Sequence, residues 1–360
     1  MTTFNKTKLI EIIDPQAETI RETTVDAPSA PVAVGLFEGM RRGKRRMTLL
    51  EVAENNLSVF PALLRDGLRA ILFDSYAGVP QTWNQWAQTI QSDKLAEDWL
   101  EEAAVGLLPK VGEGAPYPHI TRDLDRTFQI VNDKRGAIIS VTEEMIAFNR
   151  VGVLTQQTQM LGRAMAMTKE QDMYNVITTA GNYVRNSTTN DNDIGANTAA
   201  TTFGPSAFSE TILPTLSSMK DRKSGMYLGV RPNTLIVGPS LEYAAKQLFL
   251  SPTMHGMGGA DTATVTYGAG TSNPFRGVFD LIVVSPFIQS FSFVVMERQR
   301  AAVLQQVWPL QLLQGTMTAD NADYLNFDTI NYRAREFYGA GMLNDRYAYY
   351  SSSTTAPTID

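Results

Sequence analysis

Apolar residues recur at helical spacing in two long segments of the chain. The first segment has a proline in its opening turn, Pro61, and continues through leucines and isoleucines to Phe73. The second segment begins near Val151 and continues to about residue 180 without a proline. A helix of that length would span roughly 45 Å. Both segments are therefore predicted to be amphipathic helices, and the second needs a long surface to pack against.

The region between these two segments changes its pattern once. Leu95 and Trp99 begin a stripe at spacing four that predicts a helix over 92–107. After a stretch rich in proline and glycine, two β-prone runs follow at 127–131 and 137–141, separated by Asn-Asp-Lys-Arg-Gly. We predict a hairpin with a charged tip from these two runs.

The remainder of the chain alternates between helical and extended patterns. Its last part carries Ile330, Tyr332, Ala334 and Glu336 on one face of a long strand with a polar opposite face. Together with the preceding segments this predicts an α+β fold. The expected elements of the third quarter are helices at 208–219 and 239–248 and strands at 234–237, 278–284 and 291–296.

The first 46 residues have poor hydrophobic periodicity and end in a dense basic cluster. The cluster consists of Arg41, Arg42, Lys44, Arg45 and Arg46. Such a run can neutralise phosphates, but it lacks interleaved aromatic residues and the whole chain has a net charge of -6. A solvated or protein-contacting role is therefore favoured over nucleic-acid binding. The same segment lacks the apolar core of a secretory signal, so we expect synthesis in the cytosol and no membrane span.

The composition limits the available chemistry. The chain has no cysteine and two histidines, His119 and His255, which are not in ligand spacing. Disulfides, thiolate metal sites and cysteine nucleophiles are excluded. We therefore predict no catalytic, cofactor-binding or metal-binding residues, and a protein that is not an enzyme. Charged residues make up 19% of the chain, less than the usual quarter, which favours extensive subunit contact.

Seven segments, taken in this order, resemble the major capsid proteins of tailed phages with the Hong Kong 97 capsid fold, especially the Mu-like major head subunits. The segments are FPALLRDGLRAILFDSYAGVP (60–80), LPKVGEGAPYP (108–118), KRGAIISVTEEMIAFNRVGVL (134–154), LGRAMAMTKEQDMYNVI (161–177), RPNTLIVGPSLEYAAKQL (231–248), NPFRGVFDLIVVSPFI (273–288) and YRAREFYGAGMLNDRYAYY (332–350).

The resemblance implies a division into four parts. These are an N-terminal arm (1–60), a peripheral P domain with the long spine helix (61–119, 142–204 and 326–360), an extended E-loop hairpin (120–141) and an axial A domain (205–325). The arm and the hairpin would contact neighbouring subunits. We accordingly expect intersubunit contacts from the basic cluster and from Asp133, Lys134 and Arg135 near the expected hairpin tip.

The resemblance also implies partners and a location. Copies of the chain would form hexamers and pentamers of an icosahedral shell that encloses double-stranded DNA without binding a particular sequence. A separate scaffolding protein and a portal are expected, and the virion is the expected location. Two alternatives stay open at this point: the shell of an encapsulin-like nanocompartment, and a soluble α/β enzyme with a site built from loops in 231–296.

Overall fold

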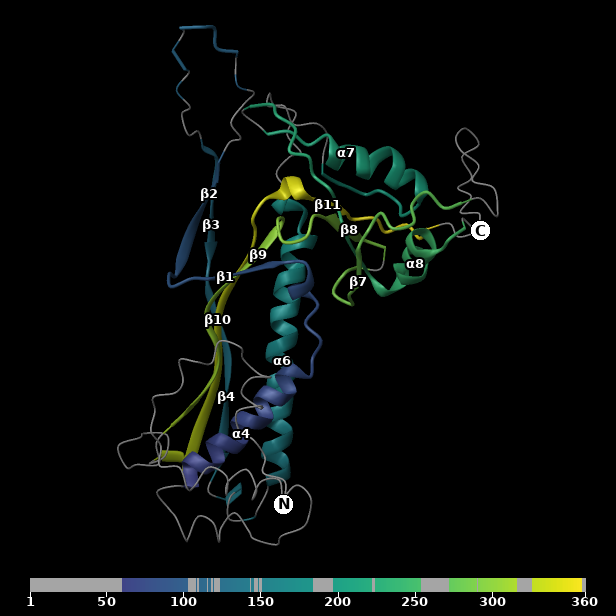
Figure 1. Cartoon of the computed structure of the whole chain (residues 1–360). Coiled ribbons are helices and arrows are strands. Elements are labelled where there is room, and N and C mark those ends of the chain that lie inside the picture. The colour runs from purple at the N-terminus through teal and green to yellow at the C-terminus, as the bar shows by residue number, and fades with distance from the viewer. Residues whose placement is uncertain are drawn as a thin grey trace, which may run out of the picture. The chain divides into compact units, whose positions relative to one another are not determined.

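We analysed a computed structural model of the chain (Figure 1). By contacts it divides into two compact units, of which the first comprises the described residues of 60–75, 138–162 and 312–333, and the second comprises those of 76–137, 163–311 and 334–357. The structure describes residues 60–102, 124–142, 151–183, 197–221, 224–253, 272–289, 291–315 and 326–357, with short stretches between 108 and 119 and between 144 and 148.

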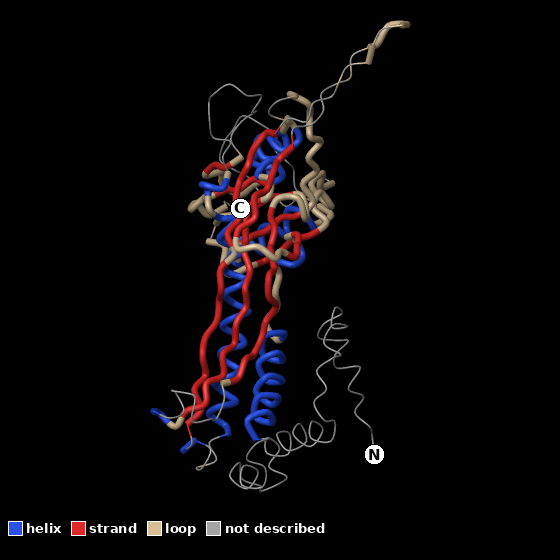
Figure 2. Tube along the Cα trace, turned by 90° about the vertical axis from the view of Figure 1, so that its left-hand side faces the viewer, coloured by secondary structure: helices blue, strands red, loops and turns tan. Residues whose placement is uncertain are grey.

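Helix α6 (Val151–Thr178) lies beside a four-stranded sheet, as Figures 1 and 2 show. The strand order is β1-β9-β10-β4. The long strands β9 and β10 run in opposite directions, since the Gly315 amide donates to Asn331 and the Leu343 amide donates to Ala301. The strand bounds are Gln88–Gln91 for β1, Ala302–Gln314 for β9, Thr329–Met342 for β10 and Asp133–Thr142 for β4.

The first unit has a core of its own. Helix α4 (Phe60–Ala77) contributes Leu64 and Leu68, and the start of α6 contributes Leu154. The sheet faces them with Ile139 and Val141 of β4 and with Ile330 and Tyr332 of β10. The residues from each strand are two positions apart, so they share one face of the sheet. The apolar periodicity read from the sequence therefore becomes a layer of helices on a sheet.

The second unit contains a five-stranded sheet in the order β5-β11-β8-β6-β7. In β6 (Thr234–Val237), Leu235 and Val237 belong to one core cluster and Ile236 to another. Because apolar cores cover both faces, the central strands are continuous apolar runs without polar alternation. The other strands are β5 (Thr198–Ala199), β7 (Leu281–Val284), β8 (Phe293–Met296) and β11 (Ala348–Ser351).

Short helices cover one face of this sheet. A π-helical segment (Ala207–Ile212) continues into α7 (Leu213–Ser217), and a 3-10 turn (Pro239–Leu241) opens α8 (Glu242–Leu250). Their aromatic side chains pack edge to face: the Phe249 ring lies 4.9 Å from Phe208 and 4.7 Å from Phe279 between centroids. The helices and strands predicted between 205 and 296 are thus present, with strand ends that differ by a few residues.

The expected hairpin over 120–141 is wrong in its pairing. Strand β3 (Leu124–Val131) pairs antiparallel with β2 (Ala96–Glu102), while β4 belongs to the four-stranded sheet. Asn132 joins β3 to β4 without a tight turn, because its amide donates to the Leu95 carbonyl and its side chain to the Lys94 carbonyl. These bonds hold the chain extended at a sequence that has the composition of a turn.

The predicted helix over 92–107 is also wrong where the structure describes it, because 96–102 forms strand β2. The apolar spacing of four residues that suggests a helix places side chains on one face of a strand as well. Trp99 lies directly opposite Phe128 across the β2–β3 pair, and such cross-strand aromatic pairs favour a sheet. Strands β1 and β9 had no counterpart in the sequence-based prediction.

The remaining long elements agree with the sequence. Helices α4 and α6 and strand β10 are present, and the α+β class is confirmed. None of the helices in the described part of the chain combines the length and the apolar character that a membrane crossing requires.

Candidate functional site

The residues expected to contact neighbouring subunits fall in two places. Arg41, Arg42, Lys44, Arg45 and Arg46 lie outside the described residues. Asp133, Lys134 and Arg135 do not form a hairpin tip, because they open strand β4. Their role in intersubunit contact stays a prediction.

Lys134 and Arg135 both have partners within their own chain. The Lys134 ammonium lies 5.4 Å from the centre of the Trp308 ring, and Trp308 packs edge to face on Phe337. The Arg135 Nε donates to Asp172 Oδ2 of α6 at 3.2 Å. Because consecutive residues of a strand point to opposite faces, these two cations serve different faces of the sheet.

A buried ion pair joins α6 to β10. Lys169 Nζ lies 3.8 Å from Glu336 Oε1, and both side chains are almost completely buried. The ammonium also lies over two aromatic rings, 5.5 Å from the centre of Trp83 and 5.3 Å from that of Tyr338. Desolvation of such a pair largely cancels its Coulomb attraction, so its main effect is to make any other packing of α6 on β10 unfavourable.

Burial dominates the proton affinities around this pair. It lowers the pKa of Lys169, although the charge of Glu336 acts in the opposite sense. Burial also raises the pKa of Glu336, against the effect of Lys169. The neighbouring Tyr76 has a raised pKa, first because of burial and then because of the Glu336 charge. Each shift follows from the cost of a charge in a site of low dielectric.

The sequence carried a signal for this pair that its pattern analysis did not use. Lys169 lies four residues after Met165 and four before Met173, on the buried stripe of α6. Glu336 follows Ile330, Tyr332 and Ala334 on the apolar face of β10. A lysine and a glutamate that each interrupt an apolar face are candidates for a buried pair, since buried charges are generally paired.

The β2–β3 hairpin is a two-stranded ribbon that pairs with no other strand in the described part of the chain. On one face Trp99 and Phe128 are half-buried. On the other face the Gln129 side chain donates to Asp98 Oδ1 at 2.8 Å. The ribbon is labelled in Figure 1. Isolated two-stranded ribbons are marginally stable in water and need a further surface.

The hairpin also exposes apolar side chains to solvent. Leu95, Leu100 and Val131 are 69%, 56% and 52% exposed. In the connection between β2 and β3, Leu108 and Tyr117 are more exposed still. Clustered exposure of this kind marks a surface that another protein covers.

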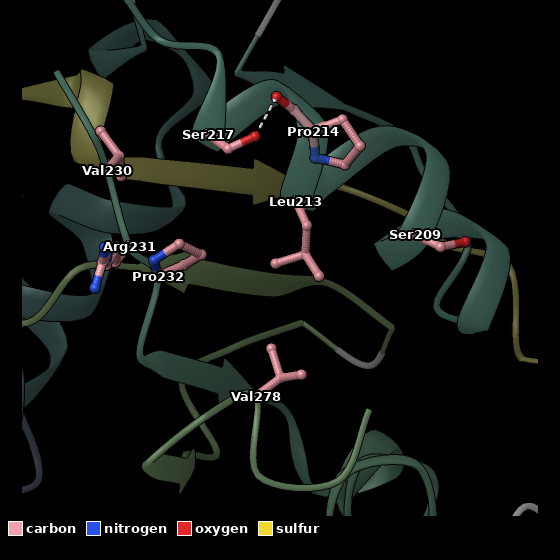
Figure 3. Close-up of a pocket in the computed structure, with 8 residues that line it drawn as sticks. All are labelled: Ser209, Leu213, Pro214, Ser217, Val230, Arg231, Pro232 and Val278. Atoms are coloured by element: carbon pink, nitrogen blue, oxygen red, sulfur yellow. Dashed lines mark hydrogen bonds between the residues drawn. The ribbon is translucent and has the colours of Figure 1, made fainter. Parts of the chain in front are cut away.

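A shallow hollow of about 480 Å³ lies in the second unit near α7 (Figure 3). Its lining includes Leu213, Pro232 and Val278, and Arg231 is the one ionisable side chain among the lining residues. In the figure the Ser217 hydroxyl donates to the Pro214 carbonyl, at 3.0 Å, so it is bonded within its own helix. Within the described ranges no three acidic or histidine side chains come together as a metal site would require.

The comparison with known families decides what these surfaces belong to. The chain matches the phage capsid protein family over residues 127–351, which is more than half of its length. It belongs to that family. Among curated proteins, none matches the chain. The matched range begins in β3 and ends with β11, so it includes α6, both larger sheets and the buried ion pair. The prediction of a phage capsid protein is confirmed.

Solved capsid structures share the fold of this phage capsid protein at low sequence identity. The capsid of an empty GTA particle is 11% identical with a TM-score of 0.50, and the match covers 76% of this chain and 90% of that one. The capsid of cyanophage P-SCSP1u is 14% identical with a TM-score of 0.47, covering 76% and 87%. A virus-like particle from Pyrococcus furiosus is 11% identical with a TM-score of 0.46, covering 79% and 98%.

Proposed function

We propose that this capsid protein is the major head subunit of a tailed phage or prophage, with Mu-like relatives. Its copies assemble through hexamers and pentamers into an icosahedral shell that encloses double-stranded DNA. The four-part division expected from the sequence applies, with one change: the hairpin that reaches a neighbouring subunit is the β2–β3 ribbon rather than residues 120–141. A separate scaffolding protein and a portal complete the assembly, which begins in the host cytoplasm.

The observation that carries this proposal is the incomplete burial of the hairpin. The ribbon has no third strand among the described residues, and Leu100 and Val131 remain exposed in the single chain. A neighbouring copy that covers them supplies about 25 cal/mol for each Å² of apolar surface removed from water. That gain offsets the entropy lost when the ribbon is ordered.

Assembly of the purified full-length chain, followed by light scattering and electron microscopy, tests the proposal. We expect closed shells or capsomer-sized rings from the parent chain. Leu100→Asp places a charge in the covered surface, so we expect a loss of these assemblies. The proposal fails if the parent chain stays a monomer or dimer at high concentration.

The matched control is Leu100→Met, which keeps an apolar side chain of similar volume. This variant assembles like the parent if Leu100 acts through apolar contact. Assembly by Leu100→Asp at the parental level shows instead that this face of the hairpin stays uncovered in the particle.

A further inference from the structure

Two glycines of β10 lie beneath the base of the hairpin. Gly339 and Gly341 are two residues apart on one strand, so they share one face of the sheet. Ile130 and Asn132, at the end of β3 and just after it, lie against that face, and both are buried. The base of the ribbon therefore packs directly on the backbone of β10.

Neither glycine has room for a side chain. A Cβ on Gly339 would lie 2.8 Å from the Val131 carbonyl oxygen and closer still to Asn132 Oδ1. A Cβ on Gly341 would lie 2.6 Å from Ile130 Cγ1 and closer to its Cδ1. At Gly339 the obstacle includes backbone, which must shift as a unit, whereas at Gly341 it is the end of one flexible side chain.

Both strands of the ribbon are fixed at this same point. The Asn132 amide donates to the Leu95 carbonyl, and the Asn132 side chain donates to the Lys94 carbonyl, each at 2.8 Å. Asn132 thus links the residues that lead into β2 to the residue that follows β3. A displacement of the β3 end away from β10 would carry the whole ribbon with it.

We infer that Gly339, Gly341 and Asn132 are positioning residues that set the direction in which the hairpin leaves the body of the subunit. The inference rests on the proposed function, because direction matters only if the ribbon must meet a neighbouring copy. A small rotation at the base becomes a larger displacement at the far end, since a strand extends about 3.3 Å per residue. Close backbone approach, and not the glycines' flexibility, is what these positions require.

Spin-label distance measurement on the unassembled full-length chain tests this inference. The chain has no cysteine, so Gln129→Cys on the hairpin and Asn175→Cys on α6 provide two defined attachment sites, both exposed. We expect Gly339→Ala to shift and broaden the distance distribution while the chain still melts cooperatively. An unchanged distribution in a folded Gly339→Ala chain overturns the inference.

The matched control is Gly112→Ala, in the connection between β2 and β3, where a Cβ would meet nothing within 4 Å. We expect this control to keep the parental distance and the parental yield of shells, and a shift of the same size as in Gly339→Ala contradicts the inference. Loss of shells in Gly339→Ala, measured on unlabelled protein, is the second expected result.

A compensating pair covers the case in which Gly339→Ala does not fold. Gly341→Ala should also shift the distribution, and Ile130→Ala in the same chain should return it toward the parental distance, because it removes the atoms that the new methyl meets. Failure of the pair to differ from Gly341→Ala alone overturns the inference. Absence of shells from the parent chain would instead overturn the proposed function, since the distance measurement does not depend on assembly.

Discussion

In the five-stranded sheet every residue of β6 and β8 is buried, whereas in the β2–β3 hairpin Asp98, Leu100, Gln129 and Val131 all face solvent. The sheet has apolar clusters on both faces. The hairpin has half-buried aromatic residues on one face and no strand beyond its two edges in the described part of the chain. Both regions are β-structure from one chain, so the difference lies in what covers them.

This difference separates stability from assembly. The sheet completes its burial within one subunit, so substitutions there should change the free energy of unfolding. The hairpin leaves apolar surface for another molecule, so substitutions there should change association with little effect on folding. In a capsid protein without disulfides, the strength of the particle then depends on surface that a single subunit cannot bury.

The largest effect is expected for Phe249→Ala in the aromatic cluster of the sheet. Phe249 is fully buried against Phe208 and Phe279, and removing such a ring lowers the free energy of unfolding by about 4 kcal/mol. Urea unfolding monitored by circular dichroism measures it. The neighbouring Leu250 is 55% exposed, so Leu250→Ala should change stability by less than about 0.5 kcal/mol. Equal effects at the two positions would show that this cluster is not a core.

A second effect, of about 3 kcal/mol, is expected for Lys169→Met. The substitution leaves the Glu336 carboxylate buried without its cation, and breaking a buried pair in this way is strongly destabilising. Adding Glu336→Leu should recover most of the loss in the same unfolding measurement. Lys246→Met, which breaks the exposed pair with Glu242, is the control and should have little effect. Additive losses in the double variant would contradict the account.

A smaller, pH-dependent effect is expected at Tyr183. Burial first, and then the Asp345 charge, raise the pKa of this phenol. Above pH 10 the phenol ionises in the unfolded chain and stays protonated in the folded one, so stability falls as the pH rises.

Tyr183→Phe removes this proton and also the hydrogen bond that the hydroxyl donates to the Ile177 carbonyl. The variant should be less stable by about 1 kcal/mol at pH 8, and the difference should close above pH 10. Melting temperatures between pH 8 and pH 11 measure both results. A constant difference across this range would mean that the phenol ionises in the folded state as well.

The smallest effect on stability, less than about 0.5 kcal/mol, is expected for Leu100→Asp on the hairpin. Hydrogen exchange should show the corresponding contrast in the parent: amides of β2 and β3 exchange quickly in the unassembled chain, and those of β6 and β8 slowly. Assembly should slow exchange in the hairpin and leave the sheet unchanged. Slow exchange in the hairpin before assembly would remove the contrast between the two regions.

Much of the helical structure follows from local pattern alone. Helices α4 and α6 agree with the apolar spacing after Pro61 and Val151, because a helix satisfies its backbone within the segment and shows its buried face at fixed intervals. Strand β10 agrees with the alternation from Ile330 onward for the same reason. The absence of cysteine also follows from the sequence alone, and with it the dependence of this protein on packed surface.

The tertiary structure decided the pairing of strands and the burial of charges. Residues 96–102 form a strand because 124–131 pair with them, and no local spacing encodes a partner that lies more than twenty residues away. The pair of Lys169 and Glu336 likewise joins positions far apart in the chain. The sequence determined which faces are apolar; only the folded chain decided which of those faces meet one another and which are left for a neighbouring copy.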